Sequence, residues 1–193
     1  MSFNIEFQHM PLDTLMTAKD ALAIYNFLEE SGITIWLDGG WAVDAQLELQ
    51  TRRHNDLDIA IELSDVATYC QVMADIGYKR VPRVGDKPEN FVLGDDCGHE
   101  IDTHVFVRDE HGNGIYGPAE NNDMWPAASL RSLGKINGQL VRATSPECLV
   151  QFHTGYEVDA DDWHDVKLLC KKFGLEIPAD YRKFISLAEE FSC

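Results

Sequence analysis

The feature that most constrains this chain is a diglycine turn, at Gly39 and Gly40, which joins two different sequence patterns. The residues before it, Ile33 to Leu37, form a short β-branched and aromatic run typical of a strand, and those from Trp41 to Leu49 show helical spacing of apolar side chains. Glycine allows a positive φ and a close approach of backbone to ligand, and the N–H groups at a helix start point toward bound phosphate. The sequence therefore predicts an anion-binding turn between a strand and a helix.

An aspartate pair, Asp56 and Asp58, lies at the start of the next predicted strand, Leu57 to Leu63. Residues two apart in a strand face the same side, so both carboxylates point to one place while the apolar residues between them face the core. Such carboxylates repel each other unless a cation lies between them, and hard oxygen ligands suit Mg²⁺ or Mn²⁺. The pair is therefore predicted to bind a divalent metal ion.

A third carboxylate is available on a later alternating run. Glu100, Asp102 and His104 share one face of this predicted strand, while Ile101 and Thr103 take the other. If the strand neighbours the one that carries Asp-x-Asp, three carboxylates can hold two metal ions ~3.5–4 Å apart. That arrangement serves in-line phosphoryl or nucleotidyl transfer.

Each part of this pattern has an ordinary explanation when it stands alone. An isolated Gly-Gly is usually a turn, and an isolated Asp-x-Asp is usually a solvated strand face. The whole succession, in this order, is far more specific. A calcium EF-hand is excluded because Ala60 stands at the third ligand position after Asp56, and His164 stands at the glycine position after Asp159. Zinc lacks support, since the histidines and cysteines do not combine at finger-like spacing.

The acidic charge of the chain limits its partners. The net charge of −17 over 193 residues repels a phosphate backbone, so long nucleic-acid substrates are disfavoured. The same charge attracts divalent cations or a cationic small molecule, although a solvated acidic surface is the simpler explanation. No run approaches the ~20 apolar residues of a membrane span, no secretory signal is recognisable, and the cysteines form no C-x-x-C pair. We therefore expect a cytoplasmic protein with no membrane partner and with reduced thiols.

We expect two regions in the chain. Residues 1–143 combine helices and strands, and residues 144–193 are helical. Further helices are predicted at Leu12–Glu30, Asp65–Ile76, Pro146–Gly155, Asp161–Phe173 and Pro178–Glu190. Further strands are predicted at Tyr78–Val84, Phe91–Leu93, Glu100–Val107 and Gly138–Ala143. Between Arg108 and Asn137 the sequence is rich in Gly, Asn, Asp and Pro, which predicts a long irregular surface segment.

These motifs resemble the antibiotic-inactivating branch of the nucleotidyltransferase superfamily. The segments 36–44 (WLDGGWAVD) and 53–58 (RHNDLD) are most similar to lincosamide nucleotidyltransferases, and aminoglycoside 2″-nucleotidyltransferases look similar. The resemblance continues through 76–78, 100–104, 153–156 and 163–167. It implies an α+β nucleotidyltransferase fold, with a mixed β-sheet flanked by helices and a small C-terminal helical region.

The resemblance also implies roles for the matching residues. Asp56 and Asp58 bind the metal, and Asp102 either completes the metal site or acts as the general base. The implied nucleotide contacts are Gly39, Gly40, Arg53, His54 and Lys167. A surface lysine without a ligand is the alternative for Lys167.

Candidate acceptor contacts are Glu100, His104 and Tyr156, because aromatic and carboxylate groups together suit amines. The acidic stretch 157–162 is a weaker candidate. The alternatives are a core role for Tyr156 and a helix-start role for the acids.

The implied reaction moves a nucleoside monophosphate from a nucleoside triphosphate, with ATP as the expected donor, to a hydroxyl of a small molecule. A lincosamide or an aminoglycoside is the expected acceptor, Mg²⁺ or Mn²⁺ the expected cofactor, and a monomer or homodimer the expected state. One alternative is a toxin-like enzyme that modifies a protein or RNA hydroxyl. Another is a non-catalytic nucleotide-binding module.

Overall fold

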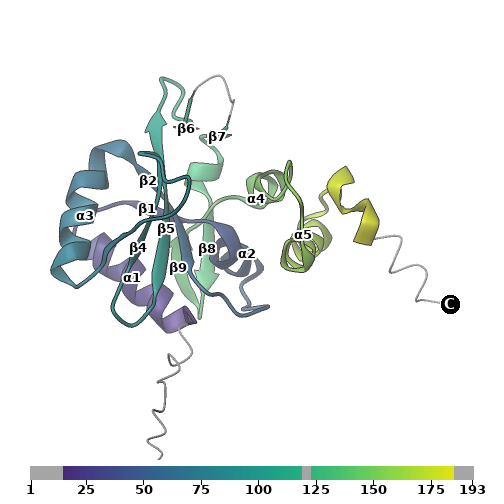
Figure 1. The fold of residues 1–193 in the computed structure, drawn as a ribbon. Helices are drawn as coiled ribbons and strands as arrows, with labels where there is room; N and C mark the ends of the chain where they lie inside the picture. Colours follow the sequence, from purple (N-terminus) through teal and green to yellow (C-terminus); the bar gives the residue numbers. More distant parts are fainter. Residues whose placement is uncertain (1–14, 119–122, 185–193) are drawn as a thin grey trace, which may run out of the picture.

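The computed structural model describes residues 15–118 and 123–184, which form an α+β fold (Figure 1). The helices are α1 (Ala18–Glu30), α2 (Gly39–Leu47), α3 (Val66–Asp75), α4 (Pro146–Phe152) and α5 (Ala160–Phe173), with short 3-10 turns η1 (Leu63–Asp65), η3 (Ser129–Arg131) and η4 (Ala179–Tyr181). The strands are β1 (Ile35–Leu37), β2 (Leu57–Glu62), β3 (Lys79–Val81), β4 (Asn90–Gly94), β5 (Glu100–Arg108), β6 (Gly114–Tyr116), β7 (Met124–Trp125), β8 (Leu133–Ile136) and β9 (Gln139–Arg142). None of the helices in the described part of the chain is long and apolar enough to cross a membrane.

The main sheet is mixed, as predicted. Its order is β1-β2-β5-β4-β3, and β6 adds to the far end of β5 and pairs with β7. β2 and β5 run parallel, whereas the other neighbours along this path are antiparallel. β8 and β9 form a separate hairpin that contacts α2. The parallel pairing sets Asp58 directly opposite Asp102.

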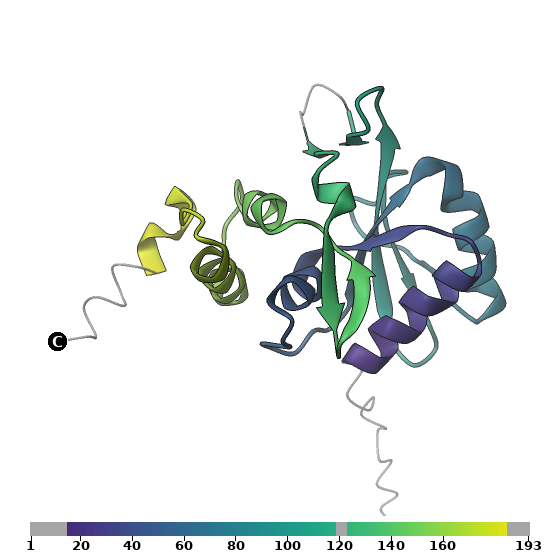
Figure 2. The ribbon, with the colours of Figure 1, turned by 180° about the vertical axis from the view of Figure 1, so that it is seen from behind.

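The sheet separates two apolar clusters. One face of β2 and β5 presents Ile59, Ile61 and Ile101, all fully buried, to a core that includes residues of α1 and α3. The other face carries a smaller cluster of Trp36, Ala60, Phe106, Trp125, Leu130 and Cys148. α1 and α3 lie together on one side of the molecule, while α4 and α5 extend from the other side (Figures 1 and 2). The alternation seen in the sequence thus assigns the two faces correctly, and Asp58, Asp102 and His104 lie on the face of the smaller cluster.

The segment Arg108–Asn137 is the clearest correction to the sequence prediction. Its described residues are not irregular, because they hold β6, β7, η3 and all of β8. β6 pairs with the end of β5, and β7 pairs with β6, which brings Trp125 over the smaller cluster. Strands of two to four residues are too short to show period-two patterning among turn residues, and their pairing depends on a strand elsewhere in the chain.

Several predicted boundaries also change. α1 starts later than predicted, because Thr17 caps it in a reciprocal capping box with Asp20; positions 12–14 of the predicted helix lie outside the described residues. α2 starts earlier, at Gly39 itself. The strand predicted at Tyr78–Val84 is only three residues long. The last predicted helix is described up to 184, as η4 and a following helical turn, and its remainder lies outside the described residues.

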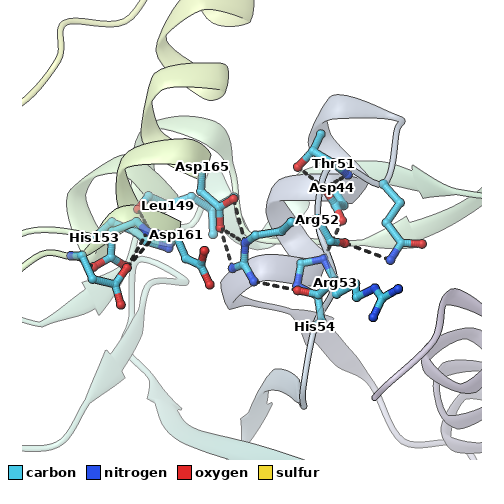
Figure 3. A network of polar contacts seen from close by, with 12 residues as sticks. Asp44, Thr51, Arg52, Arg53, His54, Leu149, His153, Asp161 and Asp165 are labelled. Carbon is cyan, nitrogen blue, oxygen red and sulfur yellow. Dashed lines mark hydrogen bonds and ion pairs between the residues drawn. The ribbon is translucent and has the colours of Figure 1, made fainter. Parts of the chain in front are cut away.

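A salt bridge joins α5 to the loop that precedes β2. The guanidinium of Arg52 donates to both carboxylate oxygens of Asp165, with Nη2 to Oδ2 at 2.7 Å and Nε to Oδ1 at 3.0 Å (Figure 3). Asp165 is fully enclosed, at 1% exposure, and Arg52 is partly covered. Farther along α5, Lys172 donates to the backbone oxygens of Gln46 and Leu47 at the end of α2. The C-terminal helices are therefore tied to the elements that carry the diglycine turn and the aspartate pair. The division of the chain at residue 143 stays a prediction.

We predict that Asp165→Ala lowers the free energy of unfolding by about 3 kcal/mol, because it leaves a partly covered guanidinium without its partner. Urea titration measures this loss. The matched control is Lys135→Gln, which removes the exposed pair between Lys135 and Glu48 and is expected to cost less than about 1 kcal/mol. Equal losses in the two variants would contradict the role given to the Arg52 pair.

Candidate active site

The diglycine turn is shaped by the protein's own side chains. Gly39 has a positive φ of 51°, and a Cβ there would lie 2.1 Å from Oδ2 of Asp58. Gly40 has helical backbone, and a Cβ there would lie 2.5 Å from Nδ1 of His54 and 2.6 Å from Nη2 of Arg52. The positive φ that glycine allows is therefore used at Gly39 and not at Gly40. Gly39 makes room for a carboxylate, and Gly40 makes room for the side chains beneath the helix start.

The end of β1 brings this turn to the carboxylates. The backbone N–H of Asp38 donates to the carbonyl of Asp58 at 2.9 Å, so α2 begins directly beside β2. Asp38 is the N-cap of α2, yet its side chain makes no capping hydrogen bond. Its carboxyl group is buried and faces the same cavity as Asp58 and His104. The sequence analysis did not single out Asp38; its only signal was its place immediately before the two glycines.

Three side chains converge at the centre of the site. The ligating atoms of Asp58, Asp102 and His104 lie within 4.8 Å of one another. His104 Nε2 is 3.7 Å from Oδ1 of Asp58, and both side chains are about a quarter exposed. Oδ1 of Asp102 is buried and has no hydrogen-bond partner among the described residues. An orphaned carboxylate oxygen beside two further donors suits a divalent cation, so the residues present fit the predicted metal.

Asp56 stands at the edge of this group. It is not among the three converging side chains, but it shares their electrostatic field. Burial raises its pKa to about 6, and the charges of Asp58, Asp102 and Glu100 add to this effect. Its predicted metal contact stays a prediction.

Burial and neighbouring negative charges also shift the pKa values of the other ionisable groups of the site. Burial raises the pKa of Asp38, and the charge of Asp58 raises it further. Burial likewise raises the pKa of Asp102, with a further contribution from Asp58. For His104 burial lowers the pKa, but the pairing with Asp58 and the charges of Asp38, Asp58 and Asp102 outweigh this effect, so its pKa rises to about 9. The site thus holds more negative charge than the protein alone neutralises, and a bound cation relieves this repulsion.

A cavity of about 390 Å³ opens above these groups. Its walls come from the turn, the sheet and the C-terminal helices, and they are lined by Asp38, Gly39, Asp58, His104, Tyr116, Asp123, Trp125, Phe152, His153 and Tyr156. A second hollow, of about 260 Å³, lies beside Asp102 and includes Arg83, Lys87 and Asn90. Tyr116 lines both hollows. Two hollows that flank one set of carboxylates suit a reaction between two bound molecules.

The side chains predicted to contact phosphate differ in their burial and in their position. His54 is buried, with Nε2 2.5 Å from Oδ2 of Asp44 and its ring against Trp41, so it supports the start of α2 from below (Figure 3). Arg53 is exposed. Lys167 is exposed on α5, with Nζ 5.6 Å from the ring of Trp163, and does not line the cavity. Their contacts with nucleotide stay predictions.

The residues predicted to contact the acceptor do not all lie in the same hollow. Tyr156 lines the cavity and donates from its hydroxyl to Asp162 at 2.9 Å. Glu100 is paired with Arg83 at the second hollow. The nearby acids have a structural use, because Asp159 and Asp162 form the capping box of α5. That agrees with the helix-start alternative for the acidic stretch.

Comparison with known proteins identifies the family. The profile of the Aminoglycoside-2''-adenylyltransferase family matches residues 20–169. The chain belongs to this family. A lincosamide resistance protein of Staphylococcus haemolyticus is 28% identical over 154 residues, 80% of this chain and 94% of that protein. A 2''-aminoglycoside nucleotidyltransferase of Klebsiella pneumoniae is 45% identical over 164 residues, 77% of this chain and 82% of that protein.

The fold agrees with a solved relative. The crystal structure of the lincosamide antibiotic adenylyltransferase LnuA with lincomycin bound matches with a TM-score of 0.69 at 28% identity, and covers 79% of this chain and 96% of that one. The family, the α+β nucleotidyltransferase fold and the enzyme class predicted from the sequence are confirmed. The described relatives modify antibiotics of two classes. Their names therefore do not determine the acceptor of this enzyme.

We predict that Gly39→Ala lowers kcat/KM by at least ~10²-fold, because the new methyl group displaces the carboxylate of Asp58 and small misplacements cost this much. Gly138→Ala is the matched control: Gly138 also has a positive φ, 82°, but nothing lies within 4 Å of its Cβ position. Both variants carry backbone strain of roughly 1–2 kcal/mol, so only the collision differs. Equal values of kcat/KM in the two folded variants would contradict the collision between a side chain at position 39 and Asp58.

We predict that Asp56→Asn raises the melting temperature of the metal-free protein at pH 7.5. The pKa of Asp56 in the folded protein, about 6, exceeds its ordinary value of 3.8, so ionisation destabilises the fold as pH rises through this window. The advantage of the variant must therefore shrink as the pH falls from 7 to below 5, and Mg²⁺ must stabilise the wild type more than the variant. Thermal unfolding measures both effects, with the exposed residue Asp96 supplying the control Asp96→Asn. A difference that does not change with pH would contradict the crowding of these carboxylates.

Proposed function

We propose that this enzyme transfers a nucleoside monophosphate, with ATP as preferred donor, to a hydroxyl of a small antibiotic of the lincosamide or aminoglycoside class. The observation that carries the proposal is the register pair of Asp58 and Asp102, set beside the helix start at Gly39. Paired carboxylates next to an anion-binding backbone suit a magnesium nucleotide. The family membership supports the same reaction, because relatives named for both antibiotic classes match most of the chain.

The residues of the site have different roles in the proposed transfer. Asp56, Asp58 and Asp102 would hold Mg²⁺ or Mn²⁺, which when bound offsets the charge that develops on the reacting phosphate. The first N–H groups of α2 at Gly39 orient the triphosphate. Asp102 accepts the proton of the acceptor hydroxyl through the carboxylate oxygen that does not bind the cation. The hydroxyl oxygen forms a bond to the α-phosphorus as the bond from that phosphorus to pyrophosphate breaks.

The cavity walls favour an acceptor with both a ring and an amine. Tyr116, Trp125 and Phe152 supply aromatic surface, and Asp123 adds a carboxylate at the rim. Aromatic faces and carboxylates together bind protonated amines. Lincosamides and aminoglycosides both carry amines and several hydroxyls, so the walls support this pair of classes over a nucleic acid.

The test is pyrophosphate release, measured with Mg²⁺, each of the four nucleoside triphosphates, and a panel of lincosamides, aminoglycosides or no acceptor. We expect release only with an antibiotic, and most rapidly with ATP. Asp58→Asn and Asp102→Asn should each lose on the order of 10³-fold in kcat, since each removes several kcal/mol of stabilisation from the reaction. The control Asp96→Asn should keep full activity.

Three outcomes would overturn the proposal or its mechanism. Release that requires a protein or RNA acceptor would identify a toxin-like enzyme instead. Nucleotide binding without release under every condition would identify a non-catalytic module. Wild-type turnover in a folded Asp58→Asn variant would remove the mechanism.

A further inference from the structure

His104 lies where a ligand of the catalytic cation would lie. It is on the same face of β5 as Asp102, and its Nε2 is 3.7 Å from Oδ1 of Asp58 on the neighbouring strand. Ligands held about 2.1 Å from one ion in an octahedron lie about 3 Å apart when they are neighbours and about 4.2 Å apart when they are opposite. The distance between Nε2 and the carboxylate exceeds the neighbouring value by less than about 1 Å, so a small side-chain movement brings both atoms to a single ion.

The other ring nitrogen of His104 is already supported. The amide nitrogen Nδ2 of Asn90 lies 3.4 Å from Nδ1 of His104 and donates to the hydroxyl of Tyr116 at 3.0 Å. Asn90 pairs with His104 across β4 and β5, so this support is built into the sheet. Coordination through Nε2 requires this amide to be flipped, so that its oxygen accepts from Nδ1, and requires the cation to take the place of the proton on Nε2. Metal-bound histidines almost always have such a partner on the second nitrogen.

The cavity contains a second histidine that lacks this arrangement. Nδ1 of His153 donates to the carbonyl of Leu149 at 2.7 Å, on the C-terminal side of the cavity. His153 does not belong to the group of side chains that converge with Asp58 and Asp102. It is therefore a matched control for any effect that arises from a histidine in the cavity.

We propose that Nε2 of His104 coordinates the catalytic cation together with Asp58 and Asp102, and that this nitrogen makes the site prefer Mn²⁺ to Mg²⁺. Mg²⁺ favours oxygen ligands in a strict octahedron, whereas Mn²⁺ accepts imidazole more readily and stands at the start of the transition-metal affinity series. The role of this cation in turnover rests on the proposed function. The ligand set itself does not, because metal binding is measurable without any reaction.

The test is pulsed electron paramagnetic resonance of Mn²⁺ bound to the full chain without nucleotide. A directly coordinated imidazole gives ¹⁴N modulation of the spin echo. We expect this modulation in the wild type and in His153→Gln, and its loss in His104→Gln. Incorporation of ¹⁵N-histidine into the wild type must replace the ¹⁴N pattern with that of ¹⁵N, which identifies a histidine ligand even if a variant fails to fold.

The metal preference is measured by titration. Free Mn²⁺, followed by its room-temperature resonance in competition with Mg²⁺, should bind His104→Gln at least about tenfold more weakly, because a ligand is expected to matter at least as much as its supporting shell. Affinity for Mg²⁺ should fall less, so that the preference for Mn²⁺ decreases. Bound Mn²⁺ with no nitrogen coupling in the wild type, or a coupling that survives in folded His104→Gln, would overturn the assignment.

These measurements separate this inference from the proposed function. Nitrogen coupling without pyrophosphate release would leave His104 as a metal ligand in a protein of different activity. Pyrophosphate release without nitrogen coupling would leave the reaction in place and overturn the role of His104.

Discussion

The repulsion between carboxylates on two paired strands is the constraint on which this structure depends. The parallel register of β2 and β5 sets Asp58 against Asp102, and the buried apolar residues on the opposite face of both strands prevent a slip of that register. Gly39 then leaves room for the carboxylate of Asp58 where any side chain would collide with it. The core therefore imposes a charge arrangement that the protein alone leaves only partly neutralised, and a cation completes it.

A second layer of polar contacts holds the diglycine turn in place from below. Gly40 has no side chain because the ring of His54 and the guanidinium of Arg52 occupy that space. Those two groups are fixed in turn by Asp44 and Asp165 (Figure 3). The ion pair reaches α5, so the helices that supply one wall of the cavity and the turn that faces it share one support. Each glycine of the motif thus serves an internal contact, which explains the pair better than ligand approach alone.

The sequence analysis succeeded where a local pattern carries the information. Period-two alternation placed Asp58, Asp102 and His104 on one sheet face, and the family resemblance supplied the fold. It missed the residues whose position depends on distant pairing. Tyr116 and Trp125 line the cavity only because β6 and β7 extend the sheet from β5, and no pattern within that Gly- and Asn-rich segment records the pairing. It also missed Asp38, because an aspartate before a helix is usually a cap, and here the side chain faces the cavity instead.

The composition of the cavity makes it unfavourable for an anion unless a cation is bound. Among its described lining residues there is no lysine or arginine, and Asp38, Asp58 and Asp123 add negative charge. A triphosphate brought to such walls meets repulsion that the partial charge of one helix start offsets only in part. Two basic residues expected near phosphate do not line this cavity: His54 is enclosed beneath the turn, and Lys167 is exposed on α5 with its Nζ 5.6 Å from the ring of Trp163. A cation held by Asp58, Asp102 and His104 would reduce this repulsion, and the second hollow beside Asp102 adds the positive charge of Arg83 and Lys87.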